Sequence, residues 1–131
     1  MSTDEDFFGN KDLESLNAWA KSRALRIEVS RMSRSLPTEE KFRLTDQLIR
    51  SSRSVSANLA EGYGRYHFID AAKFCSNARG SLTELLDHLY VCKDEEFISE
   101  EQFVQIKEKV VDCKKTINGY MKFLRSKSKN K

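Results

Sequence analysis

The sequence predicts an all-α protein, a single antiparallel up-down four-helix bundle, from three observations. Apolar residues recur every three or four positions along most of the chain, which is the period of a helix with one buried face. One proline and five glycines leave few places to interrupt a helix, and these fall between the periodic stretches. Because 131 residues hold one core, we expect one bundle over residues 11–126, between a flexible acidic leader (1–10) and a basic tail (127–131).

The first helix is expected from Lys11 to Ser35, and Pro37 ends it because the residue before a proline is pushed out of the helical region. Two apolar stripes run along it. The first stripe consists of Leu13, Leu16, Ala20, Ala24 and Ile27. The second stripe consists of Leu25, Val29, Met32 and Leu36. One core cannot cover both, so we expect the second stripe to lie at an interface.

The second helix is expected to start at Thr38, an N-cap followed by the acidic pair Glu39 and Glu40. Its core stripe is Leu44, Leu48, Val55 and Leu59. Gly62 and Gly64 stop it, since glycine is the usual C-terminal cap. It also carries small residues at helical spacing: Ser51, Ser52, Ser54, Ser56, Ala57 and Ala60. These indicate either close packing inside the bundle or a subunit interface.

The third helix is expected from about Phe68 to the acidic run 94–96. Its core stripe is Ala71, Cys75, Ala78, Leu82, Leu85, Leu89 and Cys92. The fourth begins at the capping box Ser99–Gln102, which Ile98 and Phe103 flank as a hydrophobic staple. Its stripe is Phe103, Ile106, Val110, Cys113, Ile117, Tyr120 and Leu124, after which the basic tail frays. Short connections make neighbouring helices antiparallel.

Catalytic and metal-binding patterns are weak. His88 and Cys92 share a helical face that Cys113 could approach, but the paired ligand spacing of structural zinc is missing. An odd number of cysteines inside helices favours reduced core thiols. Residues 61–65 lack the strand and the glycine spacing of a nucleotide-binding loop. We therefore expect no enzyme activity, no metal and no cofactor. No apolar run reaches membrane-spanning length and the first residues are acidic, so we expect a cytoplasmic protein without membrane contact.

Charge is segregated along the chain. Residues 1–14, 15–66, 67–106 and 107–131 carry net charges of −4, +5, −5 and +7. Basic clusters attract phosphate, and arginine binds it with two hydrogen bonds at once. The candidate nucleic-acid-binding residues are Arg43, Arg50, Arg53 and Arg65 in and after the second helix, and Lys107, Lys109, Lys114, Lys115, Lys122 and Arg125 in the fourth.

Several motifs resemble one bacterial family. They are residues 44–50, 54–62 and Arg65, then Phe74, Ala78, 80–82, Glu84 and Leu85, then 98–103. Over residues 13–125 they resemble the four-helix-bundle proteins encoded in intervening sequences of bacterial 23S ribosomal RNA genes. The positions that match the family motif are Gln47, Arg50, Asn58, Glu61, Gly62, Glu84 and Arg65. Ser56 departs from it, because isoleucine or proline is usual there.

The resemblance implies a five-membered ring with a central channel and a basic surface. Similar proteins are accessory factors of the reverse transcriptases of diversity-generating retroelements. We therefore expect a homo-oligomer, a pentamer by this resemblance, that binds RNA or other nucleic acid through phosphates; Ser56→Arg should weaken both assembly and binding. The alternative is a scaffold for an acidic or helical protein partner, such as a reverse transcriptase. An enzyme is the third and least favoured hypothesis, because the sequence offers no group of titratable residues that would converge in a pocket.

Overall fold

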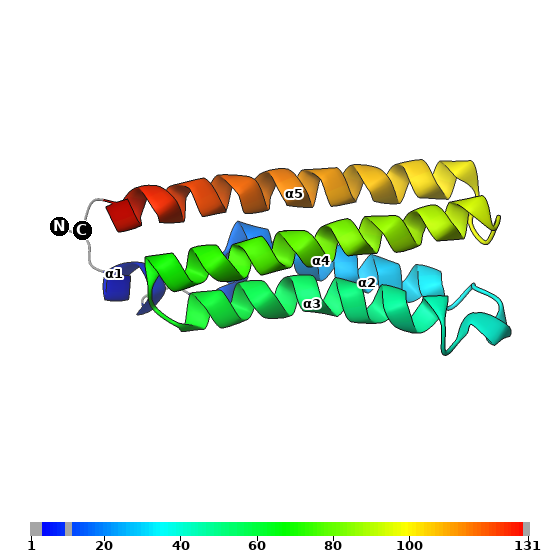
Figure 1. The fold of residues 1–131 in the computed structure, drawn as a ribbon, viewed down its shortest axis with the longest axis horizontal. Helices are drawn as coiled ribbons and strands as arrows, with labels where there is room; N and C mark the ends of the chain where they lie inside the picture. Colours follow the sequence, from blue (N-terminus) through cyan, green and yellow to red (C-terminus); the bar gives the residue numbers. More distant parts are fainter. Residues whose placement is uncertain (1–3, 10–11, 130–131) are drawn as a thin grey trace.

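A computed structural model describes residues 4–9 and 12–129, and within them the chain is all-α. The main helices are α2 (Asn17–Ser33), α3 (Leu44–Gly64), α4 (Phe68–Asp94) and α5 (Glu100–Lys129). The shorter elements are helix α1 (Asp4–Gly9) and the 3₁₀ turns η1 (Leu13–Ser15) and η2 (Thr38–Glu40). The four main helices lie side by side in alternating directions, so the predicted four-helix bundle is confirmed (Figure 1). Assembly into a ring stays a prediction.

The bundle has a square cross-section in which every main helix has two principal neighbours. Helix α3 packs on α2 and α4, and α5 packs on the same two helices. Helices α3 and α5 therefore occupy diagonal corners. All seven residues of the predicted α4 stripe are buried, as are those of the α5 stripe except the half-buried Tyr120. In the described ranges, no helix is long and apolar enough to cross a membrane.

The first helix differs from the prediction in its start and in its buried face. It begins at Asn17 rather than Lys11, because Leu16 is extended (φ −82°, ψ 106°) after the separate turn η1. The side chains that face the core are Ala18, Ser22, Leu25, Val29 and Ser33. The expected core residues Ala20, Ala24 and Ile27 are exposed instead. Leu25, Val29 and Leu36, which we expected at an interface, are core residues.

The core face of α2 contains two buried serines, which hide it in the sequence pattern. Ser22 Oγ donates a hydrogen bond to the Trp19 carbonyl (2.8 Å), and Ser33 Oγ donates to the Ser30 carbonyl (2.8 Å). Each hydroxyl is satisfied by its own helix, so it enters the core without an unpaired polar group. In the sequence these serines break the apolar period, which made the neighbouring stripe look like the core.

The second long helix starts at Leu44, because residues 38–40 form η2 and residues 41–43 form a turn. Its end at Gly64 is confirmed, but the predicted mechanism was wrong. Gly62 and Gly64 are helical, and the left-handed residue after the helix is Tyr66 (φ 58°). Gly62 serves close packing instead: a Cβ there would lie 2.7 Å from the Cβ of Phe74 on α4.

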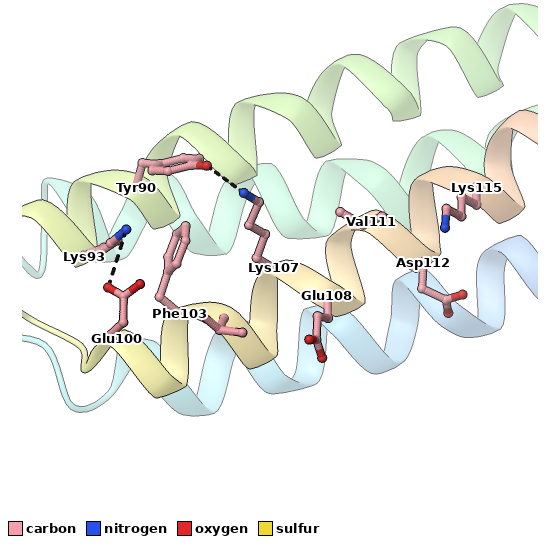
Figure 2. A pocket seen from close by; sticks show the side chains of 10 residues that line it. Tyr90, Lys93, Glu100, Phe103, Lys107, Glu108, Val111, Asp112 and Lys115 are labelled. Atoms are coloured by element: carbon pink, nitrogen blue, oxygen red, sulfur yellow. Dashed lines mark hydrogen bonds and ion pairs between the residues drawn. The ribbon is translucent and has the colours of Figure 1, made fainter.

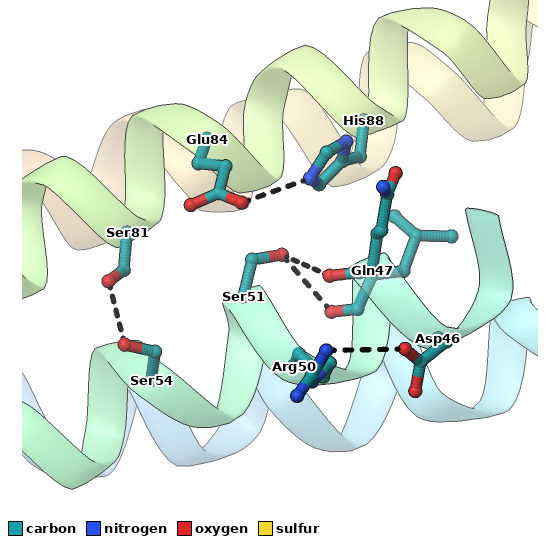
Figure 3. A network of polar contacts seen from close by, with 9 residues as sticks. Asp46, Gln47, Arg50, Ser51, Ser54, Ser81, Glu84 and His88 are labelled. Atoms are coloured by element: carbon teal, nitrogen blue, oxygen red, sulfur yellow. Dashed lines mark hydrogen bonds and ion pairs between the residues drawn. The ribbon is translucent and has the colours of Figure 1, made fainter. Parts of the chain in front are cut away.

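The serines of α3 pack inside the bundle. Ser51, Ser52 and Ser56 are buried, and each donates a hydrogen bond to a carbonyl of α3. Ser54 bonds to Ser81 of α4 across 2.8 Å (Figure 3). The packing alternative is therefore confirmed for these buried serines, whereas Ala57 of the same set is exposed. The effect of Ser56→Arg on assembly and binding stays a prediction, but because Ser56 is buried the variant would force a guanidinium into the core and act by destabilising the fold.

The start of α5 matches the predicted capping box. The Ser99 amide donates to Gln102 Oε1 (2.9 Å), and the Gln102 amide donates to Ser99 Oγ (3.1 Å). Ile98 and Phe103 are both buried beside it, as a hydrophobic staple requires. The helix continues to Lys129, so it extends into the segment that we expected to fray from residue 127.

The leader that we expected to be flexible contains α1, which packs on one end of the bundle (Figure 1). Phe8 is 1% exposed, with ring centroids 5.4 Å from Tyr63 and 5.4 Å from Phe68. The Phe7 ring centroid lies 5.3 Å from that of Phe123 in α5. These aromatic contacts join the leader to α3, α4 and α5.

Candidate nucleic-acid interface

Four arginines lie between α2 and α3, around a hollow of about 360 Å³. We call it the arginine hollow. Its lining residues are Arg26, Ile27, Ser30, Arg31, Arg34 and Arg53. Residues four or eight apart share a helical face, so Arg26, Ser30 and Arg34 project to the same side of α2. Helix α3 packs antiparallel on α2 and contributes Arg53 to the same hollow.

The lining contains four guanidinium groups and no carboxylate. None of the ion pairs recorded among the described residues involves these four arginines. Glu28, the nearest acid on α2, pairs instead with Lys109 of α5. Uncompensated like charges create a positive potential that attracts anions, and the planar guanidinium fork suits phosphate oxygens.

The predicted basic residues of α3 fall into three environments. Arg53 lines the arginine hollow, and Arg43 is exposed just before α3. Arg50 is largely exposed, with Nη1 3.7 Å from Asp46 Oδ2 (Figure 3). Arg65 is held at the far end of α3, because its Nε donates to Glu61 Oε2 (3.2 Å) and its guanidinium covers the Phe74 ring.

The predicted basic residues of α5 lie on the opposite corner of the bundle, so the structure does not bring them together with those of α3. Lys114, Lys115 and Lys122 are exposed. Arg125 lines a shallow hollow with residues of α4, and Lys109 is paired with Glu28. Lys109 therefore faces α2, whereas Arg125 faces α4 and the three exposed lysines face solvent. None of these residues lines the arginine hollow.

Lys107 lies in a different kind of site, a groove of about 520 Å³ between α4 and α5 (Figure 2). Its Nζ donates to the Tyr90 hydroxyl (2.9 Å) and lies over the rings of Tyr90 and Phe103. Lys93 Nζ is 3.5 Å from Glu100 Oε2 in the same groove. Because acids compensate its lysines, this groove attracts phosphate less than the arginine hollow does.

The residues that match the family motif have structural contacts. Asn58 Nδ2 donates to the Ser54 carbonyl (2.8 Å) and to Ser54 Oγ (3.1 Å). Glu84 Oε1 lies 3.3 Å from His88 Nε2 (Figure 3). Gln47 supplies the carbonyl that accepts the Ser51 hydrogen bond, Glu61 holds Arg65, and Gly62 permits close packing. These contacts stabilise α3, α4 and the packing between the two helices.

The three cysteines are free and buried, which confirms the prediction of core thiols. Burial raises the pKa of the Cys75 thiol to about 12 and of the Cys92 and Cys113 thiols to about 11. Thiols with such pKa values are poor nucleophiles and poor metal ligands at neutral pH. Within residues 4–9 and 12–129, no three His, Cys, Asp or Glu side chains are grouped so that they could hold a metal ion.

Sequence reasoning missed three arginines of the hollow, Arg26 and Arg31 in α2 and Arg34 just after it. They belong to the +5 block of charge, and only the packing of α3 on α2 brings Arg53 next to them. The signal that could have found them is their spacing, which puts three cations and no acid along one side of the end of α2. A cluster of arginines without acids on one helical face is typical of an anion-binding surface.

Comparisons with known proteins agree with this fold. Residues 14–119 match the model of a family described as 23S rRNA-intervening sequence protein. A crystal structure of a protein with unknown function from the S23 ribosomal protein family of Bacteroides thetaiotaomicron is similar, with a TM-score of 0.74 and 23% identity. That match covers 80% of this chain and 95% of the other, and at this identity it shows the fold alone. No curated protein matches the chain.

Proposed function

The chain belongs to the 23S rRNA-intervening sequence protein family, and from this premise we propose that it binds the phosphate backbone of RNA. Binding is non-enzymatic and does not read sequence. The observation that carries the proposal is the arginine hollow, in which four guanidinium groups surround a space without an acid. Arginine forks donate paired hydrogen bonds to phosphate oxygens, so several can hold successive phosphates.

The other predicted basic residues extend this surface to different degrees. Arg50 lies on the same helix as Arg53 and Arg43 lies just before it, so they are the next phosphate contacts along α3. The exposed pair between Arg50 and Asp46 is weak and gives way to a phosphate at little cost. Lys114, Lys115, Lys122 and Arg125 offer a second strand-binding region on the opposite corner.

Homo-oligomerisation, as the pentamer that the family resemblance implies, is part of this proposal. Several copies would multiply the arginine hollow, and weak single contacts would then combine into higher avidity. Sedimentation of the full chain should give a mass several times 15.2 kDa. A monomeric mass at micromolar concentration would contradict oligomerisation. It would not decide RNA binding, which is tested separately.

A salt series tests the RNA contact. Fluorescence anisotropy with a labelled RNA hairpin should show binding that falls steeply as salt rises, because each neutralised phosphate releases counterions. The double variant Arg31→Gln/Arg53→Gln should weaken binding at least tenfold and lower the salt slope by about 2. Absence of binding at low salt, or binding that salt leaves unchanged, would overturn the proposal.

The matched control is Lys114→Gln/Lys115→Gln, which removes the same charge from the opposite corner. It should weaken binding less than the arginine double variant. Equal losses would mean that net charge, rather than the arginine hollow, decides binding. Both variants alter exposed groups, so thermal unfolding should match that of the unmodified chain within a few degrees.

A second candidate function is binding of a helical protein partner at the α4–α5 groove. The observation that favours it is the exposed apolar lining of the groove, where Val104 is 44% and Val111 39% exposed. Figure 2 shows Val111 and Tyr90 in this groove. A partner bound there should survive nuclease treatment of a lysate and be lost on Val104→Asp/Val111→Asp. A partner that is lost on nuclease treatment instead supports the RNA proposal.

A further inference from the structure

Phe42 is the most exposed aromatic residue among the described side chains. It is 86% exposed, whereas Tyr66 and Phe123 follow at 46% and 37%. Burying a phenylalanine side chain stabilises a folded protein, so a ring left in water forgoes that stabilisation. Exposed aromatic rings of this kind are typical of contact residues.

The backbone holds Phe42 outward. Two backbone hydrogen bonds close the turn over residues 41–43. The Lys41 amide donates to the Thr38 carbonyl (3.0 Å), and the Arg43 amide donates to the Glu40 carbonyl (3.0 Å). The neighbours Leu36 and Leu44 fill the buried places on either side of this connection. The ring is therefore presented by a hydrogen-bonded turn rather than left behind by a loose loop.

The charge around the ring favours an anionic ligand. Lys41 Nζ lies 5.4 Å from the Phe42 ring centroid, and Arg43 follows directly in the chain. Arg34, at the other side of the same α2–α3 connection, lines the arginine hollow. Residues 31–43 contain four cations against Glu39 and Glu40, and Glu40 is engaged at the Leu44 amide.

We propose that Phe42 stacks on an unpaired nucleobase of the bound RNA, while Lys41 and Arg43 contact the adjacent phosphates. A planar ring flanked by cations matches the alternation of base and phosphate in a single strand. The strand continues from Phe42 toward Arg34 and into the arginine hollow. This inference rests on the proposed function and adds that the site prefers unpaired RNA over a duplex.

The test compares a labelled 12-nucleotide oligoadenylate with a blunt 12-base-pair RNA duplex, both titrated with the full chain. Phe42→Ala should weaken oligoadenylate binding about tenfold and change duplex binding less than about twofold, since stacking is lost and charge is kept. Phe42→Trp should restore binding, because a larger ring stacks at least as well. The control Val91→Ala removes another exposed apolar side chain and should change neither affinity.

The other results each overturn the inference. Unchanged oligoadenylate binding, or an equal loss for both RNAs, would exclude stacking, and phosphate binding would still stand if Arg31→Gln/Arg53→Gln weakens it. No binding of either RNA by the unmodified chain would overturn this inference and the proposed function together. A change of oligomeric mass on Phe42→Ala would assign the ring to a contact between copies.

Discussion

The two ends of the bundle place phenylalanine in opposite environments. At the α1 end, Phe8 is buried against Tyr63 and Phe68, and we call this the aromatic end. At the other end, where η2 leads into α3, Phe42 is left in solvent by a hydrogen-bonded turn, and we call this the turn end. The comparison shows that the backbone around a residue decides whether the same side chain stabilises the fold or remains available for a ligand.

The largest expected effect separates these two phenylalanines directly. Phe8→Ala should lower the free energy of unfolding by about 3 kcal/mol, because it removes a buried ring and leaves a cavity. Phe42→Ala should change it by less than about 0.5 kcal/mol, since the ring touches little. Urea unfolding followed by circular dichroism measures both. An equal decrease in the free energy of unfolding for both variants would contradict the distinction between the two ends.

A second expected effect concerns how tightly the aromatic end is packed. Gly62→Ala should cost about 2 kcal/mol, because the new Cβ would lie 2.7 Å from the Phe74 Cβ and 3.1 Å from the Ala71 Cα. Gly80→Ala is the matched control in α4, with nothing within 4 Å, and should stabilise the helix by about 0.5–1 kcal/mol. Thermal unfolding that moves the same way for both variants would contradict this packing argument.

The smallest expected effect is an increase in stability at the aromatic end, where Tyr120 lies. The Tyr120 hydroxyl is buried without a hydrogen-bond partner in the described part of the chain, and burial raises its pKa. Tyr120→Phe should therefore raise the free energy of unfolding by about 1 kcal/mol, since an unpaired polar group leaves the interior. Tyr90→Phe is the control, because it loses an exposed hydrogen bond to Lys107 and should change little. A loss of stability on Tyr120→Phe would mean that the hydroxyl has a partner.

Much of the fold could be predicted because it depends on local chemistry. The capping box at Ser99 satisfies amides within four residues, and the α4 stripe from Ala71 to Cys92 follows one helical period without a polar break. The start of α3 could not be predicted as well. Thr38, Glu39 and Glu40 are typical of a helix start, yet the chain forms only a 3₁₀ turn there before Leu44 enters the core.

The candidate site was less predictable than the fold. Arg53 was predicted from the basic residues of its own helix. Its partners, Arg26, Arg31 and Arg34, lie far from it in the sequence and meet it only because α2 and α3 pack antiparallel. Arg65 and Lys107 were selected for charge, and the structure shows them held by Glu61 and by Tyr90. Net charge in a segment identifies a basic region without telling which cations are free of partners.

The sequence by itself determined the four main helices, their antiparallel order and the buried faces of α4 and α5, because helical period and capping are local properties. The tertiary structure decided which face of α2 is inside, since Ser22 and Ser33 enter the core only when their own helix satisfies them. It also decided where the cations meet, because the potential in the arginine hollow depends on distances between helices, which no local pattern of residues encodes.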